Sequence, residues 1–299
     1  MAFNLESLSM SLDQLQEQAD KDSTEKKNYK DDRFWNPTRD DSGNATAIIR
    51  FLPPPAGEQV PWVKYWNFGF KGPTGLWYFE NCLKTLDKED PVLEYNRTAW
   101  ADQSGGEEDQ KARQNGVKNR KARLNYVFNI YVVKDKNNPA NNGKVFLYRA
   151  GSTIYSIIKD AMKGNPDLEK DGIPVFDFLK GANFNMDIYT EGKGGYKFPK
   201  YDRCSFATPS PLLKGSAKEL EKVYNQLHSL QAFVADDQFK DYSELKTKLY
   251  RVLALDVDGK PSIGEGSGAA YQSSDDEDGS EEEEGGDAMD FFRNLDDSE

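Results

Sequence analysis

Short runs that alternate between apolar and polar residues recur along the first two thirds of the chain. Turn residues such as Pro53-Pro54-Pro55 and Gly72-Pro73 separate these runs. Short strands with turns between them predict a small barrel or sheet rather than a parallel α/β layout. The expected strands cover residues 45–52, 62–70, 76–81, 125–133, 144–149 and 183–189.

Three later segments carry apolar residues at helical spacing. They lie at 154–161, 220–230 and 242–255, and Ser216 and Glu219 precede the second with the spacing of a capping box. We therefore predict an α+β fold, dominated by a β-barrel core on which these helices pack.

The N-terminal segment has the apolar stripe of a short amphipathic helix. The stripe consists of Leu5, Leu8, Leu12 and Leu15. Because so short a helix is marginal alone, it either packs on its own domain or docks on a neighbouring molecule as a self-association arm. We divide the chain into a flexible arm with its linker at 1–30, a core at 31–255 and a disordered acidic tail at 256–299.

The net charge of −12 belongs entirely to the C-terminal end of the chain. Residues 272–299 hold 13 of the 51 acidic residues and one of the 39 basic residues, which leaves residues 1–271 balanced at 38 of each sign. A Gly, Ser and acid-rich composition cannot bury enough apolar surface to fold alone. The apolar residues near the terminus therefore suggest a partner-binding peptide on this tail, formed by Asp290, Phe291, Phe292, Leu295, Asp296 and Asp297.

Composition argues against several functional classes. No stretch reaches the roughly 18 apolar residues that a membrane span needs, and the acidic N-terminus does not resemble a signal peptide. Cys82, Cys204 and His228 are too few and too widely spaced for a disulfide framework or a structural zinc site. Phosphate loops and nucleophile arrangements are absent from the sequence. We expect a soluble, non-enzymatic protein without a metal.

A basic segment next to aromatic residues points to nucleic acid. Six cations and no acid lie between residues 111 and 123, and an aromatic strand follows. Cations neutralise phosphates, and aromatic faces stack on unpaired bases that duplex DNA hides. Against this interpretation, aromatic residues in a β-rich domain are mostly core, and a basic run is most often a solvated loop.

Several strings in a specific order resemble the helix-destabilising, single-stranded-DNA-binding replication proteins of T-even-type bacteriophages. The strings stand at 47–53, 75–82, 129–135, 143–149 and 181–184, and the resemblance extends from about residue 44 to about 255. It implies an OB-fold core, cooperative binding of single strands during replication, recombination and repair, contacts of the acidic tail with replication and recombination proteins, and a place in the cytoplasm of the infected bacterial host.

The resemblance also suggests which side chains contact DNA. The implied positions combine aromatic residues with the basic segment, whose part 118–123 resembles a family segment linked to DNA contact and tail competition. They are Trp77, Tyr78, Lys111, Arg113, Lys118, Arg120, Lys121, Arg123, Tyr126, Tyr148, Phe198 and Tyr201.

Two departures from the family pattern change these expectations. The family's zinc ligands, one His and three Cys, correspond here to Phe68, Cys82, Asp90 and Leu93. One thiol with two apolar side chains cannot build a tetrahedral zinc site, so we expect apolar packing in place of the metal. The basic cluster that opens the family's cooperativity arm is also missing, so cooperative binding is either weaker than in the family or runs through the leucine stripe.

Three other functions remain open from the sequence. A translational regulator that binds RNA would use the same stacking and phosphate contacts. An acidic adaptor or DNA mimic would act through proteins alone, although the basic segment argues against it. A metal-dependent nuclease would need surface carboxylates as ligands and would cut single strands in magnesium.

Overall fold

The computed structural model describes residues 31–192, 198–256 and 259. The chain divides into two compact units, Met1–Arg33 and Phe34–Glu299. Of the first unit, Asp31–Arg33 are described, and there Arg33 pairs with the Asp31 carboxylate at 2.7 Å. The predicted self-association residues and the acidic tail with its partner-binding peptide lie outside the described residues.

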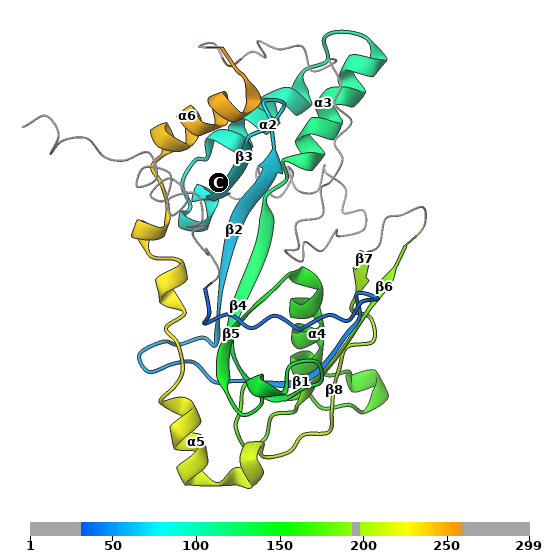
Figure 1. Ribbon diagram of the computed structural model, residues 1–299, viewed down its shortest axis with the longest axis vertical. Helices are drawn as coiled ribbons and strands as arrows, with labels where there is room; N and C mark the ends of the chain where they lie inside the picture. The colour runs from blue at the N-terminus through cyan, green and yellow to red at the C-terminus, as the bar shows by residue number, and fades with distance from the viewer. Residues whose placement is uncertain (1–30, 193–197, 257–258, 260–299) are drawn as a thin grey trace, which may run out of the picture. The chain divides into compact units, whose positions relative to one another are not determined.

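The second unit is built on an antiparallel sheet (Figure 1). Its neighbouring strands follow the order β3-β2-β4-β1-β6-β7, with β5 on β4 and β8 on β6. The strands are β1 (Ala45–Phe51), β2 (Trp62–Lys71), β3 (Trp77–Asn81), β4 (Arg123–Asp135), β5 (Val145–Ala150), β6 (Phe184–Glu191), β7 (Phe198–Lys200) and β8 (Ser205–Phe206).

The six strands predicted from the sequence are present, with shifts of one or two residues at their ends. β4 is the central strand, because β2 and then β1 pair along one edge of it while β5 pairs along the other. The path from β3 to β7 is open at both ends within the described residues. The structure thus establishes a mixed α+β fold with an antiparallel sheet, and closure into a barrel stays a prediction.

Five α-helices accompany the sheet in the described part of the chain. They are α2 (Pro91–Ala101), α3 (Glu107–Asn119), α4 (Ser152–Lys163), α5 (Ala217–Tyr224) and α6 (Tyr242–Leu253). The sequence predicted α4, α5 and α6 but missed α2 and α3. α2 begins because the Asp90 carboxylate accepts hydrogen bonds from the backbone N–H groups of Val92 and Leu93. α3 was missed because its single buried residue, Val117, leaves no apolar stripe.

α5 ends at Tyr224, earlier than the predicted helix to residue 230. The chain then continues as a strap across the sheet. The buried side-chain amide of Asn129 donates to the backbone carbonyl of His228 at 2.8 Å and accepts from its backbone N–H at 2.9 Å. These two bonds hold the strap to β4 as a neighbouring strand would.

Two large apolar clusters lie at opposite ends of β2 and β4. The first packs α4 against β1, β6 and the β4 residues Tyr126, Phe128 and Ile130, which share one strand face as predicted. The second packs α2 and α6 against Phe68 and Phe70 of β2 and against β3. Figure 1 shows α2 and α6 at the end of β2 opposite to α4. The sheet thus ends in a β2–β3 hairpin that is covered by helices on one face.

Candidate nucleic-acid interface

The basic segment 111–123 forms most of α3 and the start of β4. Lys111 and Lys118 are exposed on α3, and Lys121 and Arg123 are exposed after it. α3 ends at Asn119, and the strand that follows is fixed by its pairing with β2, in which Asn67 opposes Arg123. Lys111, Lys118 and Arg123 are therefore presented to solvent from regular elements, whereas Lys121 lies in the short loop between α3 and β4.

Arg113 and Arg120, which the sequence predicted as phosphate ligands, have partners within the protein. Arg113 donates to the backbone carbonyls of Asp102 and Ser104 and pairs with the Asp102 carboxylate at 3.5 Å, so it fastens the loop between α2 and α3. Arg120 is buried, its Nε donates to the Asn96 side-chain oxygen at 3.0 Å, and its guanidinium lies 5.1 Å from the Tyr95 ring centre. Both arginines hold α2 in place.

Three predicted DNA-facing tyrosines lie in the apolar core. The Tyr78 ring stacks on Phe70 at 5.0 Å, Tyr126 stacks on Tyr155 at 3.8 Å, and Tyr148 packs 5.8 Å from Trp35. All three are buried, so their ring faces are already covered by protein and are not available to a base. The structure thus places these three rings in the core, because strand alternation points each of them inward.

Trp77 is exposed as predicted, and it stacks on a second exposed ring that the sequence reasoning missed. The rings of Trp77 and Phe79 are nearly parallel, with centroids 4.9 Å apart and an interplanar angle of 11°. Their exposed fractions are 41% and 59%. Because residues i and i+2 of a strand share a face, the Trp77-Tyr78-Phe79 string contained the signal for this pair.

The remaining two aromatic predictions lie near the β6–β7 hairpin. Phe198 is exposed at the start of β7. Tyr201 follows that strand, is half-buried and packs against the first apolar cluster. Phe198 therefore has a ring accessible to a ligand, whereas Tyr201 is partly committed to the core.

The four positions that correspond to the family's zinc ligands form a buried cluster without a metal-binding donor set. Phe68 and Leu93 contribute apolar side chains next to Cys82. The Asp90 carboxylate accepts from the backbone N–H groups of Leu83, Val92 and Leu93 at 3.0, 2.9 and 3.4 Å. Burial raises the pKa of the Cys82 thiol well above its ordinary value, which opposes the thiolate that a metal needs. These residues do not fit a zinc ion.

Nor does the rest of the described chain offer an alternative. Among the described residues, no three His, Cys, Asp or Glu side chains converge in a way that could hold a metal ion. None of the helices in the described ranges is long and apolar enough to cross a membrane.

An antiparallel sheet that presents stacked, exposed aromatic rings beside cations is typical of proteins that bind unpaired nucleic acid. A family model described as "gp32 DNA binding protein like" matches residues 43–253 of this chain. The chain belongs to that family, whose members are non-enzymatic DNA-binding proteins, and this confirms both the resemblance and the expectation that it is not an enzyme.

Curated relatives agree with the family. The chain is 31% identical to the single-stranded DNA-binding protein of Enterobacteria phage T2 over 244 residues, which cover 81% of this chain and 75% of the relative. It is also 31% identical to the single-stranded DNA-binding protein of Enterobacteria phage T4 over 228 residues, or 75% and 71% of the two chains. A shorter match, 44% identical over 63 residues, links it to the single-stranded DNA-binding protein of Escherichia phage SV14.

Proposed function

We propose that this protein binds single-stranded DNA without reading its sequence, and that it protects and organises unpaired DNA during phage replication, recombination and repair in the cytoplasm of the bacterial host. The observation that carries the proposal is the exposed Trp77–Phe79 stack in a member of this family. The OB-fold-like barrel predicted from the sequence would be the scaffold of this binding surface.

Binding combines two physical contributions. Exposed cations, Lys111, Lys118, Lys121 and Arg123, neutralise phosphates and release counterions. Exposed rings stack on bases, and each stacked base contributes roughly 1 to 3 kcal/mol. Neither contribution depends on base identity, so every unpaired sequence is bound, whereas a duplex offers phosphates but no base faces.

A fluorescence titration tests this function. A single-stranded oligonucleotide and a duplex of equal length are added separately to the full chain at several salt concentrations, while tryptophan and tyrosine emission is followed. We expect strong quenching by the single strand and a weak response to duplex. The plot of the logarithm of the binding constant against the logarithm of the salt concentration should have a negative slope of a few units. If neither the single strand nor the duplex quenches the emission at low salt, the acidic adaptor becomes the better hypothesis. Tighter binding of an RNA of equal length than of the DNA strand would favour the translational regulator.

We further propose that the acidic tail competes with DNA for the exposed cations and recruits partner proteins once DNA displaces it. The opposite charges of residues 272–299 and of the basic segment support this competition. Deleting residues 272–299 should tighten DNA binding and increase access to duplex. A control of full length, with the tail acids changed to Asn and Gln, should behave like the deletion. Unchanged affinity at low salt in both variants would remove the idea.

The two ends of the chain have separable roles in this proposal. Replacing Phe291, Phe292 and Leu295 by Ala should abolish recruitment of replication and recombination proteins without weakening DNA binding. Replacing Leu5, Leu8, Leu12 and Leu15 by Ser should lower cooperativity on long single strands and leave affinity for a short oligonucleotide unchanged. Equal loss for short and long strands would show that the stripe packs within its own domain.

Finally, we propose that the core folds without zinc. The apolar packing of Phe68 and Leu93 and the Asp90 carboxylate bonds support this, because they already join the segments that a metal would hold together. Metal analysis should find no stoichiometric zinc, and EDTA should leave the urea midpoint unchanged. One zinc per chain, or a lower midpoint with EDTA, would contradict it.

A further inference from the structure

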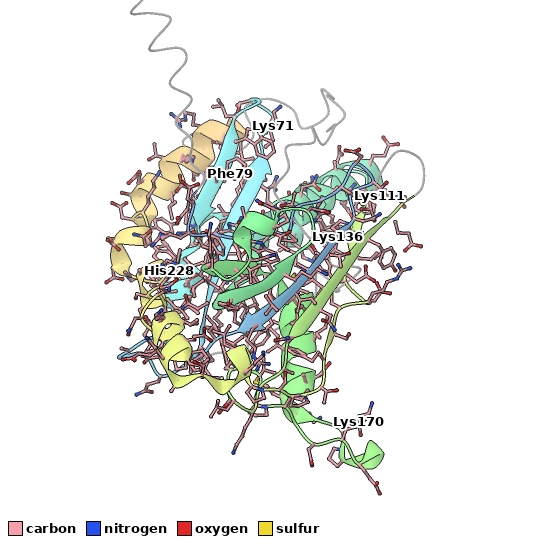
Figure 2. All side chains as sticks on the ribbon, turned by 60° about the horizontal axis from the view of Figure 1, so that its bottom comes forward. Lys71, Phe79, Lys111, Lys136, Lys170 and His228 are labelled. Atoms are coloured by element: carbon pink, nitrogen blue, oxygen red, sulfur yellow. The ribbon has the colours of Figure 1, made fainter. Side chains whose placement is uncertain are left out.

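The end of the sheet formed by β2, β3 and β4 has one covered and one uncovered face. Phe68, Phe70 and Tyr78 lie beneath α2 and α6 on the covered face. On the other face, register places Gly69 opposite Phe79, Lys71 opposite Trp77, and Asn67 opposite Arg123. Directly opposed residues of antiparallel strands project to the same side. Trp77, Phe79, Lys71 and Arg123 therefore share the uncovered face, and Figure 2 shows Lys71 and Phe79 on this hairpin.

Gly69 gives the Phe79 ring its position. A Cβ atom placed on Gly69 would lie 3.1 Å from Cε1 and 3.2 Å from Cδ1 of Phe79, and 3.8 Å from an Arg123 guanidinium nitrogen. The ring thus crosses β2 at the one point where that strand carries no side chain, and an Arg123 guanidinium nitrogen lies near the same point. A larger residue at 69 would displace the ring.

The covered face holds this arrangement rigid. The Lys248 ammonium of α6 donates to the Phe79 backbone carbonyl at 3.3 Å and pairs with the Glu80 carboxylate. Lys240 adds a second ion pair to Glu80 at 2.8 Å. Because the β3 backbone is fixed from behind, the two rings in front are ordered before any ligand arrives, which lowers the entropy cost of binding.

The charges on this face favour a polyanion with flat apolar groups. Lys71 and Arg123 flank the rings, and the nearest strand positions are the neutral amides Asn67 and Asn125, whose side chains hydrogen-bond each other at 2.9 Å. Glu80 points to the opposite face and is paired there. An apolar protein partner would leave these cations without a counter-charge, whereas a single strand supplies stacking groups and phosphates together.

We propose that Trp77, Phe79 and Arg123 form a platform on which unpaired bases stack against the outer faces of the two stacked rings, with Gly69 as the residue that positions Phe79. This site rests on the proposed single-strand binding and names its stacking surface. Arg123, whose guanidinium lies near Gly69, contacts a phosphate of the bound strand.

Titration of the full chain with oligo(dT) tests the platform. Phe79→Ala should weaken binding by about 5- to 150-fold, which corresponds to about 1 to 3 kcal/mol, and should leave the salt dependence unchanged because no phosphate contact is lost. Arg123→Met should reduce the salt slope by about 0.7. Val60→Ala, which truncates an exposed apolar residue in the β1–β2 loop, is the matched control and should bind as the parent protein does.

A double-mutant cycle tests the role of Gly69. Gly69→Val should weaken binding through Phe79, so adding it to Phe79→Ala should cost little more. If the valine variant is unstable, Gly69→Ala can be used instead, because its smaller side chain overlaps less with the Phe79 ring. Parent protein that does not bind oligo(dT) would remove the proposed function. If the parent protein binds oligo(dT) and the Phe79→Ala and Trp77→Ala variants bind it equally tightly, the platform alone is wrong. The platform is also wrong if these variants lose binding to a protein partner and keep their affinity for DNA.

Discussion

The two faces of the β2–β3 hairpin carry the same kind of residue in opposite environments. Tyr78 and Phe79 are neighbours in one strand, yet Tyr78 has an exposed fraction of 0% and Phe79 one of 59%. Tyr78 stacks within the apolar cluster beneath α6, and Phe79 stacks on an exposed tryptophan. An aromatic side chain in this hairpin therefore has no fixed role. Its role follows from whether another element covers its face of the sheet.

The basic segment repeats this contrast on a smaller scale. Lys118 is exposed on α3, while Arg120, two residues later, is buried against α2. One cation is available to a phosphate and the other maintains the fold. Substitutions that affect either stability or DNA affinity, but not both, therefore test the contrast between buried and exposed residues in the hairpin and in the basic segment.

The largest effect is expected from truncating the buried ring. Tyr78→Ala should lower the free energy of unfolding by about 3 to 5 kcal/mol, because it opens a cavity in the apolar cluster. Phe79→Ala, its matched control one residue away, should change stability by at most about 0.5 kcal/mol. Urea unfolding of both variants measures this, and similar losses from the two would break the comparison.

The basic segment should show the same division with a smaller effect. Arg120→Met should cost about 1 to 3 kcal/mol of stability, because it removes a buried charged hydrogen bond. Lys118→Met should leave stability unchanged and make the salt slope of single-strand binding shallower by about 0.7. A normal urea midpoint for Arg120→Met would mean that this arginine is not a structural residue.

A subtler change should sharpen the distinction at Tyr78. Its buried hydroxyl has no hydrogen-bond partner among the described residues, and burial raises the pKa of the phenol. Burying an unsatisfied polar group is costly, so Tyr78→Phe should keep DNA binding and stabilise the fold by up to about 1 kcal/mol. Weaker DNA binding by this variant would return Tyr78 to the interface.

The smallest effect concerns α6, the helix that covers the buried face. The Tyr242 hydroxyl donates to the Glu94 carboxylate of α2 at 2.6 Å, and this bond raises the pKa of Tyr242 from 10.0 to about 12. The folded state therefore favours the protonated phenol, so its stabilising contribution is complete below pH 10 and is lost as the pH rises toward 12. Urea unfolding from pH 9 to 12 should show a steeper loss for the parent protein than for Tyr242→Phe. Equal slopes would exclude this contribution.

Much of this molecule is determined by local patterns in the sequence. Alternation and turn residues located the six main strands, helical spacing located α4 and α6, and an ordered set of short strings identified the family. Alternation also contains the information that Trp77 and Phe79 share one face and Tyr78 the other, although Trp77 and Tyr78 were both expected to contact DNA. These features depend on residues close together in the chain, which explains why they can be predicted without a structure.

Only the tertiary structure decided which of the two hairpin faces is covered. α6 contributes distant residues to the cluster that buries Tyr78, and the bond between Thr74 and the Val252 carbonyl that helps to hold α6 on the hairpin joins positions 178 residues apart. Arg120 likewise became structural through Asn96, on a helix that the sequence did not predict. The alternation of a strand defines its two faces, but it does not determine which face a distant helix covers. The covered face is the one whose burial leaves the least apolar surface exposed over the whole fold.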